Sequence, residues 1–123
     1  MKTMILISLS IILFGCSASV SGGGDGDQGS CTAIDSPTCA TAPDYATEIE
    51  PIIDAYCVSC HQQGGEEPKE LLTSYAEVQG WSSDIARTVE DCSMPPPEDA
   101  QMSDEERSLL LEWIACGAPQ VAN

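Results

Sequence analysis

Positive charge is what this sequence has least of. Its 123 residues contain four Lys and Arg against 20 Asp and Glu, so the formal net charge is −16. Nucleic acid is itself a polyanion, and this charge balance excludes it as a partner. An acidic surface suits docking to a basic patch on a partner protein, at a rate that falls as salt rises, or it serves solubility alone.

Aromatic side chains are also few. The chain has two Trp, three Tyr and one Phe. We find no internal repeat, and residues 45–123 are close to the lower size limit for one hydrophobic core. A domain this small needs cross-links or a bound group that adds apolar surface.

The longest apolar run lies at the start of the chain. It covers Met4 to Phe14, follows a lysine, and is too short to span a membrane. With the small residue Gly15 after it, this run predicts a signal peptide over residues 1–15 and an exported protein. The segment ending at Cys16 resembles the bacterial lipobox, which implies that Cys16 is lipidated and anchors the mature chain in the cell envelope, facing the periplasm or in the outer membrane. A soluble exported protein with a spare cysteine is the alternative.

The composition changes after the predicted signal peptide. Residues 16–44 are dominated by Ser, Gly, Asp and Thr, with almost nothing apolar to bury. Such a segment behaves as a flexible coil. We therefore predict a tether between the lipidated Cys16 and a folded domain over residues 45–123.

The run Cys57-Val58-Ser59-Cys60-His61 is the strongest chemical signal in the chain. Its C-x-x-C-H spacing is that of covalent c-type haem attachment. Two thiols about one helical turn apart can form thioethers with the two vinyl groups of a porphyrin, and His61 then becomes the proximal iron ligand. A zinc half-site, a redox dithiol and a plain disulfide are the alternatives. Zinc lacks further ligands, because His61 is the only histidine.

Apolar periodicity predicts three or four short helices and no strand, so the expected fold class is all-α. The expected helices cover residues 47–57, 74–80, 83–90 and 103–117. In the first, second and fourth, the opening Thr or Ser is followed three residues later by Glu, which is the pattern of a capping box. Core positions are predicted at Ile49, Ile52, Ile53, Tyr56, Tyr75, Val78, Ile85, Val89, Leu109, Leu110, Trp113 and Ile114.

Two methionines beyond the signal peptide compete for the sixth iron position. Met94 precedes three consecutive prolines, which hold the backbone extended and present the thioether from a stiff loop. Met102 precedes Ser103, the expected cap of the last helix, where packing on that helix explains it. We predict Met94 as the distal ligand, since His and Met ligation recurs in c-type electron carriers.

These features together resemble the class I c-type cytochromes. The shared features are a helix ending at Tyr56, the C-x-x-C-H run, Met94-Pro95, and a terminal helix with Trp113. The resemblance covers residues 45–117 and implies a small cytochrome c-like helical domain around one covalently bound haem c, acting as a one-electron carrier. It assigns the haem thioethers and the iron ligands to Cys57, Cys60, His61 and Met94.

Four cysteines remain, namely Cys31, Cys39, Cys92 and Cys116. In an oxidising compartment we expect them to form disulfides, for which three pairings exist. We favour Cys92 with Cys116, which would clamp the methionine loop to the end of the last helix. Cys31 and Cys39 would then close a local loop.

The sequence thus predicts a lipid-anchored monohaem cytochrome that carries single electrons between redox proteins of the envelope, and not an enzyme. The alternative is a haem enzyme or a gas or peroxide sensor, which would leave the sixth iron position open or labile. A third alternative is an envelope module whose cysteines are all structural. Arg87 and Trp81 are candidate partners of a haem propionate, or otherwise an exposed cation and a packed side chain.

Overall fold

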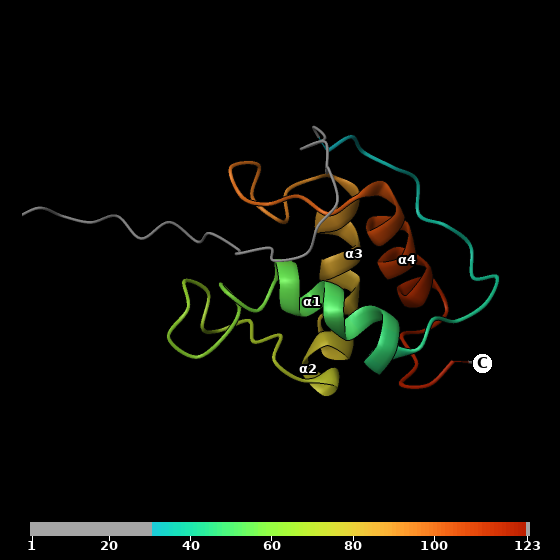
Figure 1. Ribbon diagram of the computed structural model, residues 1–123, viewed down its shortest axis with the longest axis horizontal. Helices are drawn as coiled ribbons and strands as arrows, with labels where there is room; N and C mark the ends of the chain where they lie inside the picture. The colour runs from blue at the N-terminus through green and yellow to red at the C-terminus, as the bar shows by residue number, and fades with distance from the viewer. Residues whose placement is uncertain (1–30, 123) are drawn as a thin grey trace, which may run out of the picture.

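The computed structural model describes residues 31–122, which fold into short helices without any strand (Figure 1). The fold class is therefore all-α, as predicted. The predicted signal peptide, Cys16 and the first part of the tether lie outside the described residues. No helix in the described part is both long and apolar enough to cross a membrane. The helical segments are η1 (Tyr45–Ile49), α1 (Glu50–Tyr56), α2 (Tyr75–Gly80), α3 (Ser82–Glu90) and α4 (Asp104–Ala115).

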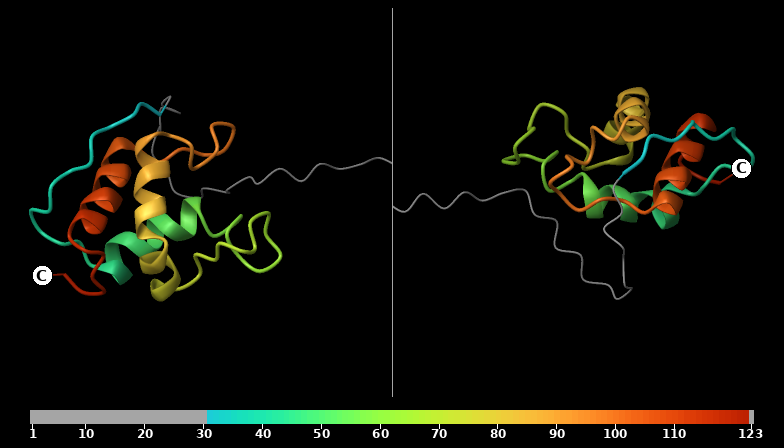
Figure 2. Two further views of the ribbon diagram at one scale, coloured as in Figure 1. Left: turned by 180° about the vertical axis from the view of Figure 1, so that it is seen from behind. Right: turned by 90° about the horizontal axis from the view of Figure 1, so that it is seen from above.

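Helices α3 and α4 pack side by side and run in opposite directions (Figures 1 and 2). The π-helical turn η1 continues directly into α1, together they cross one side of this pair, and η1 contacts α4. The short α2 packs against α3. One apolar core results, and its most deeply buried apolar side chains are Ile49, Ile53, Val78, Leu110, Leu111 and Trp113.

The last helix begins and ends where the sequence predicts. The Ser103 hydroxyl accepts a hydrogen bond from the Glu106 amide at 3.2 Å, and the Glu106 carboxylate accepts one from the Ser103 amide at 2.8 Å. Just beyond the helix, Gly117 adopts a φ of +88°, which glycine tolerates without strain. The indole of Trp113 donates to the Pro119 carbonyl at 2.7 Å. Trp113 is therefore a core residue of the domain.

Loss of this cap gives a measurable change in stability. We expect Ser103→Ala to lower the free energy of unfolding by about 1 kcal/mol, because the Glu106 amide loses its acceptor at the helix start. Ser108→Ala is the control, since Ser108 is exposed in the interior of the same helix. Urea denaturation of both variants measures the difference. An equal loss in the Ser108 variant would contradict the prediction.

The start of the first helix differs from the prediction. Thr47 was expected to cap it with Glu50, but Thr47 lies inside η1 and the cap is Asp44. The Asp44 carboxylate accepts hydrogen bonds from both the amide and the hydroxyl of Thr47, at 3.1 and 2.9 Å. A charged acceptor makes the stronger cap, so the helical turn begins three residues earlier. The second helix follows the prediction, with Ser74 accepting from the Glu77 amide.

The segment of residues 31–44 forms a strap along α4 (Figure 1). It has no helix or strand before η1, and it is cross-linked at two points, by Cys31–Cys92 and by Cys39–Cys116. The favoured pairings of Cys92 with Cys116 and of Cys31 with Cys39 are therefore both wrong. Because α3 and α4 are antiparallel, the ends that carry Cys92 and Cys116 point in opposite directions, too far apart for one bridge.

The strap is long enough to follow the whole of α4. The nine residues from Cys31 to Cys39 are joined by eight steps and can reach about 27 Å when extended, whereas the 12-residue helix α4 is only about 18 Å long. The Glu112 carboxylate on α4 also accepts the amides of Ala40 and Thr41, at 3.1 and 3.2 Å. Over residues 31–44 the structure thus differs from the free tether that the polar composition predicted.

Candidate functional site

A cavity of about 300 Å³ is lined by the end of α1, the following loop, α3, and the loop that leads into α4. This volume lies at the lower end of the range of about 300–1,000 Å³ for small-molecule pockets. Its lining brings together Cys57, Cys60 and His61 with both candidate methionines, Met94 and Met102. Sulfur and imidazole donors that are distant in sequence therefore meet at one site.

The backbone after α1 shapes the C-x-x-C-H run into a tight turn. The Cys57 amide donates to the Ile53 carbonyl at 2.9 Å, and the His61 amide donates to the Cys57 carbonyl at 3.0 Å. Residue 65 has to be glycine, because a β-carbon there would collide with the carbonyl oxygen of Cys60. The turn keeps the two cysteines and the histidine on the same cavity wall.

The His61 ring is held by one hydrogen bond. Its Nδ1 lies 2.9 Å from the backbone carbonyl oxygen of Glu70. A carbonyl can only accept, so Nδ1 carries the proton, and Nε2 keeps its lone pair. Orientation of the ring by a backbone acceptor is the usual arrangement for a histidine that ligates a metal. The donor set thus fits an iron porphyrin.

Both cysteines of the run line the cavity. Cys57 is a free thiol that is half-buried, and burial raises its pKa to about 12. It is therefore protonated at neutral pH. Cys60 supplies the second sulfur of the motif on the same wall.

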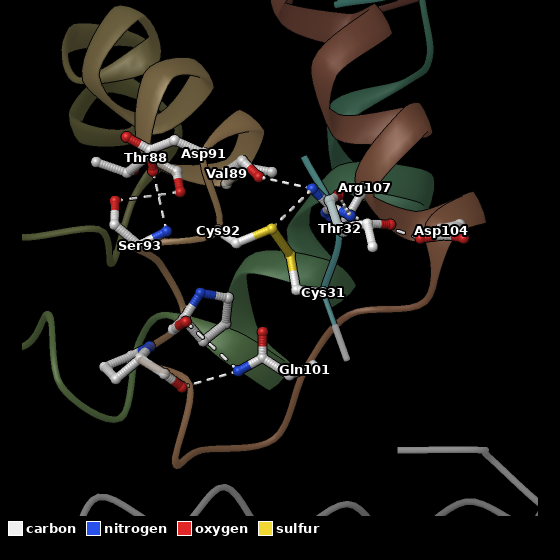
Figure 3. Close-up of a disulfide and its surroundings, with 12 residues drawn as sticks. Cys31, Thr32, Thr88, Val89, Asp91, Cys92, Ser93, Gln101, Asp104 and Arg107 are labelled. Atoms are coloured by element: carbon white, nitrogen blue, oxygen red, sulfur yellow. Dashed lines mark hydrogen bonds and ion pairs between the residues drawn. A yellow bond between two sulfur atoms is a disulfide. The ribbon is translucent and has the colours of Figure 1, made fainter. Parts of the chain in front are cut away.

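Both methionines line the cavity, but they differ in exposure. Met94 is 38% exposed, whereas Met102 is 6% exposed. The Met94 loop is nevertheless ordered by hydrogen bonds of Gln101, which is labelled in Figure 3. Its amide group donates to the carbonyls of Pro96 at 2.8 Å and Asp99 at 3.1 Å. The structure brings the predicted ligand Met94 to the site and places a second thioether beside it.

The two candidate propionate partners also reach the cavity. Arg87 forms an ion pair with Asp84 at 3.2 Å, and both side chains are more than half exposed. Such a pair contributes little to stability, so the guanidinium remains available to another anion. Trp81 is half-buried and packs against the core while lining the cavity.

Carboxylates gather along the same cavity. The exposed ones come from the loop after His61 and from α3, the half-buried Asp99 comes from the loop before α4, and few cations offset them. The described residues contain Lys69, Arg87 and the buried Arg107 as their Lys and Arg side chains. The mouth of the site is therefore acidic, and the lining carboxylates are Glu66, Glu67, Glu70, Asp84 and Asp99.

One cavity contact was not anticipated from the sequence. The Tyr56 hydroxyl donates to the Glu106 carboxylate at 3.0 Å and so ties the cavity wall to the start of α4. Burial and the hydrogen bond to Glu106 raise the pKa of Tyr56. These residues are 50 positions apart, and no periodic pattern signals a pair at that separation.

Comparison with known proteins adds a family assignment. Residues 44–114 match the family described as cytochrome C oxidase, cbb3-type, subunit III. The match spans more than half of the chain and includes the cavity residues from Tyr56 to Met102. No curated protein and no solved structure matches the chain significantly.

Proposed function

Because this chain belongs to the family of cytochrome C oxidase, cbb3-type, subunit III, we propose that it passes single electrons between protein partners of the bacterial cell envelope. Membership itself establishes a c-type cytochrome domain with covalently bound haem c and a function in haem-based electron transfer. The envelope setting, the partners and the residue roles are the proposal.

The arrangement around His61 is the observation that carries this proposal. The imidazole of His61, held through Nδ1 by the Glu70 carbonyl, lies in one cavity with two cysteines and with the side chains of two methionines. Imidazole and thioether together are the ligands of electron-carrying c-type haem. No second set of acid and base groups is needed for that function.

Each site residue has a role in holding the cofactor. In the proposal, Cys57 and Cys60 form the thioethers, His61 ligates iron through Nε2, and Met94 supplies the distal ligand. When bound, the haem supplies a one-electron change between ferrous and ferric iron. The apolar side chains of Ile85 and other lining residues exclude water from it.

The start of the chain supports export and anchoring in this proposal. Residues 1–15 have the pattern of a signal peptide, and Cys16 is the proposed site of lipidation. Thioether haem is attached outside the cytoplasm in the pathway that this motif implies, which fits an exported chain. The lipid would keep the domain at a membrane surface facing the periplasm.

The acidic mouth of the cavity favours a redox partner with a basic surface. Glu66, Glu67 and Glu70 are exposed and line the cavity that would hold the haem. Opposite charge accelerates protein association at low salt and has less effect at high salt. We expect the redox partner to present a patch of Lys and Arg to this face.

The exposure of Met94 favours a second candidate function. A thioether that is 38% exposed in the described structure is held by less packing than the buried Met102. If it leaves the iron readily, a small molecule such as a gas or a peroxide can occupy the sixth position. That behaviour would define a haem sensor or enzyme.

Ligand replacement separates these functions. We expect Met94→Ala, matured with haem in a periplasm, to lose the methionine-to-ferric charge-transfer band and to bind carbon monoxide rapidly, because its distal ligand is gone. The matched variant Met102→Ala should keep the band. Visible spectra with and without carbon monoxide measure both. A wild-type protein that already binds carbon monoxide would favour the sensor or enzyme, and loss of the band only in Met102→Ala would make Met102 the ligand.

A further inference from the structure

A single charged side chain lies buried in the described part of the protein. Arg107, on α4, is only 2% exposed. Its nearest carboxylate belongs to Asp104, at 3.5 Å, and that side chain is 77% exposed. Burying a charge without a buried counter-charge is costly, so the guanidinium has to be held by strong hydrogen bonds.

The guanidinium of Arg107 joins three separate segments (Figure 3). One terminal nitrogen donates to the Thr32 carbonyl of the strap at 2.8 Å. The other donates to the Val89 carbonyl at the end of α3, at 3.0 Å, and lies 3.5 Å from the Cys92 sulfur. Since Cys92 is bonded to Cys31, the same group contacts both the disulfide and the segments on either side of it.

Two of the residues that Arg107 contacts, Val89 and Cys92, shortly precede the proposed distal ligand Met94 in the chain. Cys92 lies two residues before Met94 and has a φ of +62°, in the left-handed region that non-glycine residues rarely adopt. After it, the amides of Ser93 and Met94 both donate to the Thr88 carbonyl, at 2.9 and 3.0 Å. The backbone between α3 and Met94 is thus a tight turn. The shape of this turn depends on where Val89 and Cys92 are held.

We propose that Arg107 is a positioning residue for Met94. Its planar fork holds the end of α3, the strap and the Cys31–Cys92 disulfide in one arrangement, which sets where the Met94 thioether enters the cavity. Lysine carries the same charge but cannot offer two rigid pairs of donors. This inference rests on the proposed function in which Met94 ligates the haem iron.

The test compares variants of the mature haem-loaded protein by competition with imidazole. Imidazole displaces a distal methionine, and the loss of the charge-transfer band measures the concentration needed. We expect Arg107→Met to require about tenfold less imidazole, because charge-assisted hydrogen bonds no longer hold the Met94 segment. Methionine fills a similar buried volume, and an apolar replacement of a buried charge is often tolerated. Arg107→Lys should show a smaller decrease, of about threefold.

Two controls separate positioning from general effects. Lys69→Gln removes one exposed positive charge. Ser103→Ala destabilises α4 without removing any hydrogen bond of the turn before Met94. Both should need the same imidazole concentration as the wild type. A change of less than twofold in Arg107→Met, or an equal change in either control, would overturn the inference. If Arg107→Met does not fold, Arg107→Lys decides by the same criterion.

The wild-type spectrum distinguishes failure of the inference from failure of the proposed function. A wild-type protein without the charge-transfer band, or one whose band survives Met94→Ala, would show that Met94 is not the ligand, and both proposals would fall. A wild-type band that depends on Met94 and is unaffected by the Arg107 variants would overturn the positioning role alone.

Discussion

The double variant Cys57→Ala and Cys60→Ala will contain no covalently bound haem after maturation in a periplasm. Thioether bonds need a sulfur at each position, and alanine provides none. His61 would remain in the cavity, held by the Glu70 carbonyl, so any haem still present would be bound only through its iron and by packing. Denaturation in acid should then extract it completely, whereas the wild-type haem should stay with the polypeptide.

Intact mass and haem staining of a denaturing gel measure this outcome. Each single variant should keep one thioether and therefore retain stained haem. Gln63→Ala is the matched control, because Gln63 is an exposed residue of the same loop and does not line the cavity. Haem that stays with the polypeptide of the double variant through denaturation would refute the assignment of these two cysteines.

The second large effect concerns the strap. Replacing Cys39 and Cys116 together by serine should lower the free energy of unfolding by about 4 kcal/mol, because the unfolded chain regains the entropy of a loop closed over 77 residues. For a domain of this size that corresponds to a fall in melting temperature of roughly 15–30 °C. Thermal and urea unfolding of the haem-loaded protein measure it.

Peptide mapping without reductant provides the control for this experiment. The wild type should yield one fragment that links Cys31 to Cys92 and another that links Cys39 to Cys116. In the double variant the first should persist unchanged. A fragment linking Cys92 to Cys116 would contradict the structure, and an unchanged melting temperature would contradict the entropic argument.

Local signals in the sequence were sufficient for most of the helices. The caps at Ser74 and Ser103, the φ > 0 position at Gly117 and the spacing of apolar residues act within a few residues of each other. The first helix was placed less well, because Asp44 and Thr47 are both good cap residues and the charged carboxylate of Asp44 is the stronger acceptor.

Features that depend on distant contacts were not predictable in the same way. Disulfide pairing depends on helix direction, and the antiparallel arrangement of α3 and α4 separates Cys92 from Cys116. Polar composition indicated a flexible tether, yet bridging to two helix ends holds residues 31–44 against α4. Nothing in the local pattern shows that a lone arginine on a helix, Arg107, becomes buried under that strap.

The candidate site was predicted in its chemistry but not in its surroundings. The C-x-x-C-H run identifies its own residues, because attachment chemistry requires that spacing. Its supports are the Glu70 carbonyl, the close approach at Gly65, and the hydrogen bond from Tyr56 to Glu106. The Glu70 carbonyl is a backbone group, which is the same in every residue and leaves no mark in a sequence.

The two disulfides of the strap also determine what a protease can release. One bridge spans residues 31–92 and the other spans 39–116, so every peptide bond from Cys31 to Cys116 lies within at least one closed ring. A single cut anywhere in that interval opens a ring but frees no fragment. All of the proposed haem-binding residues, from Cys57 to Met94, lie inside it. A nicked molecule therefore keeps both walls of its cavity in one covalent piece and separates into fragments only when its disulfides are reduced.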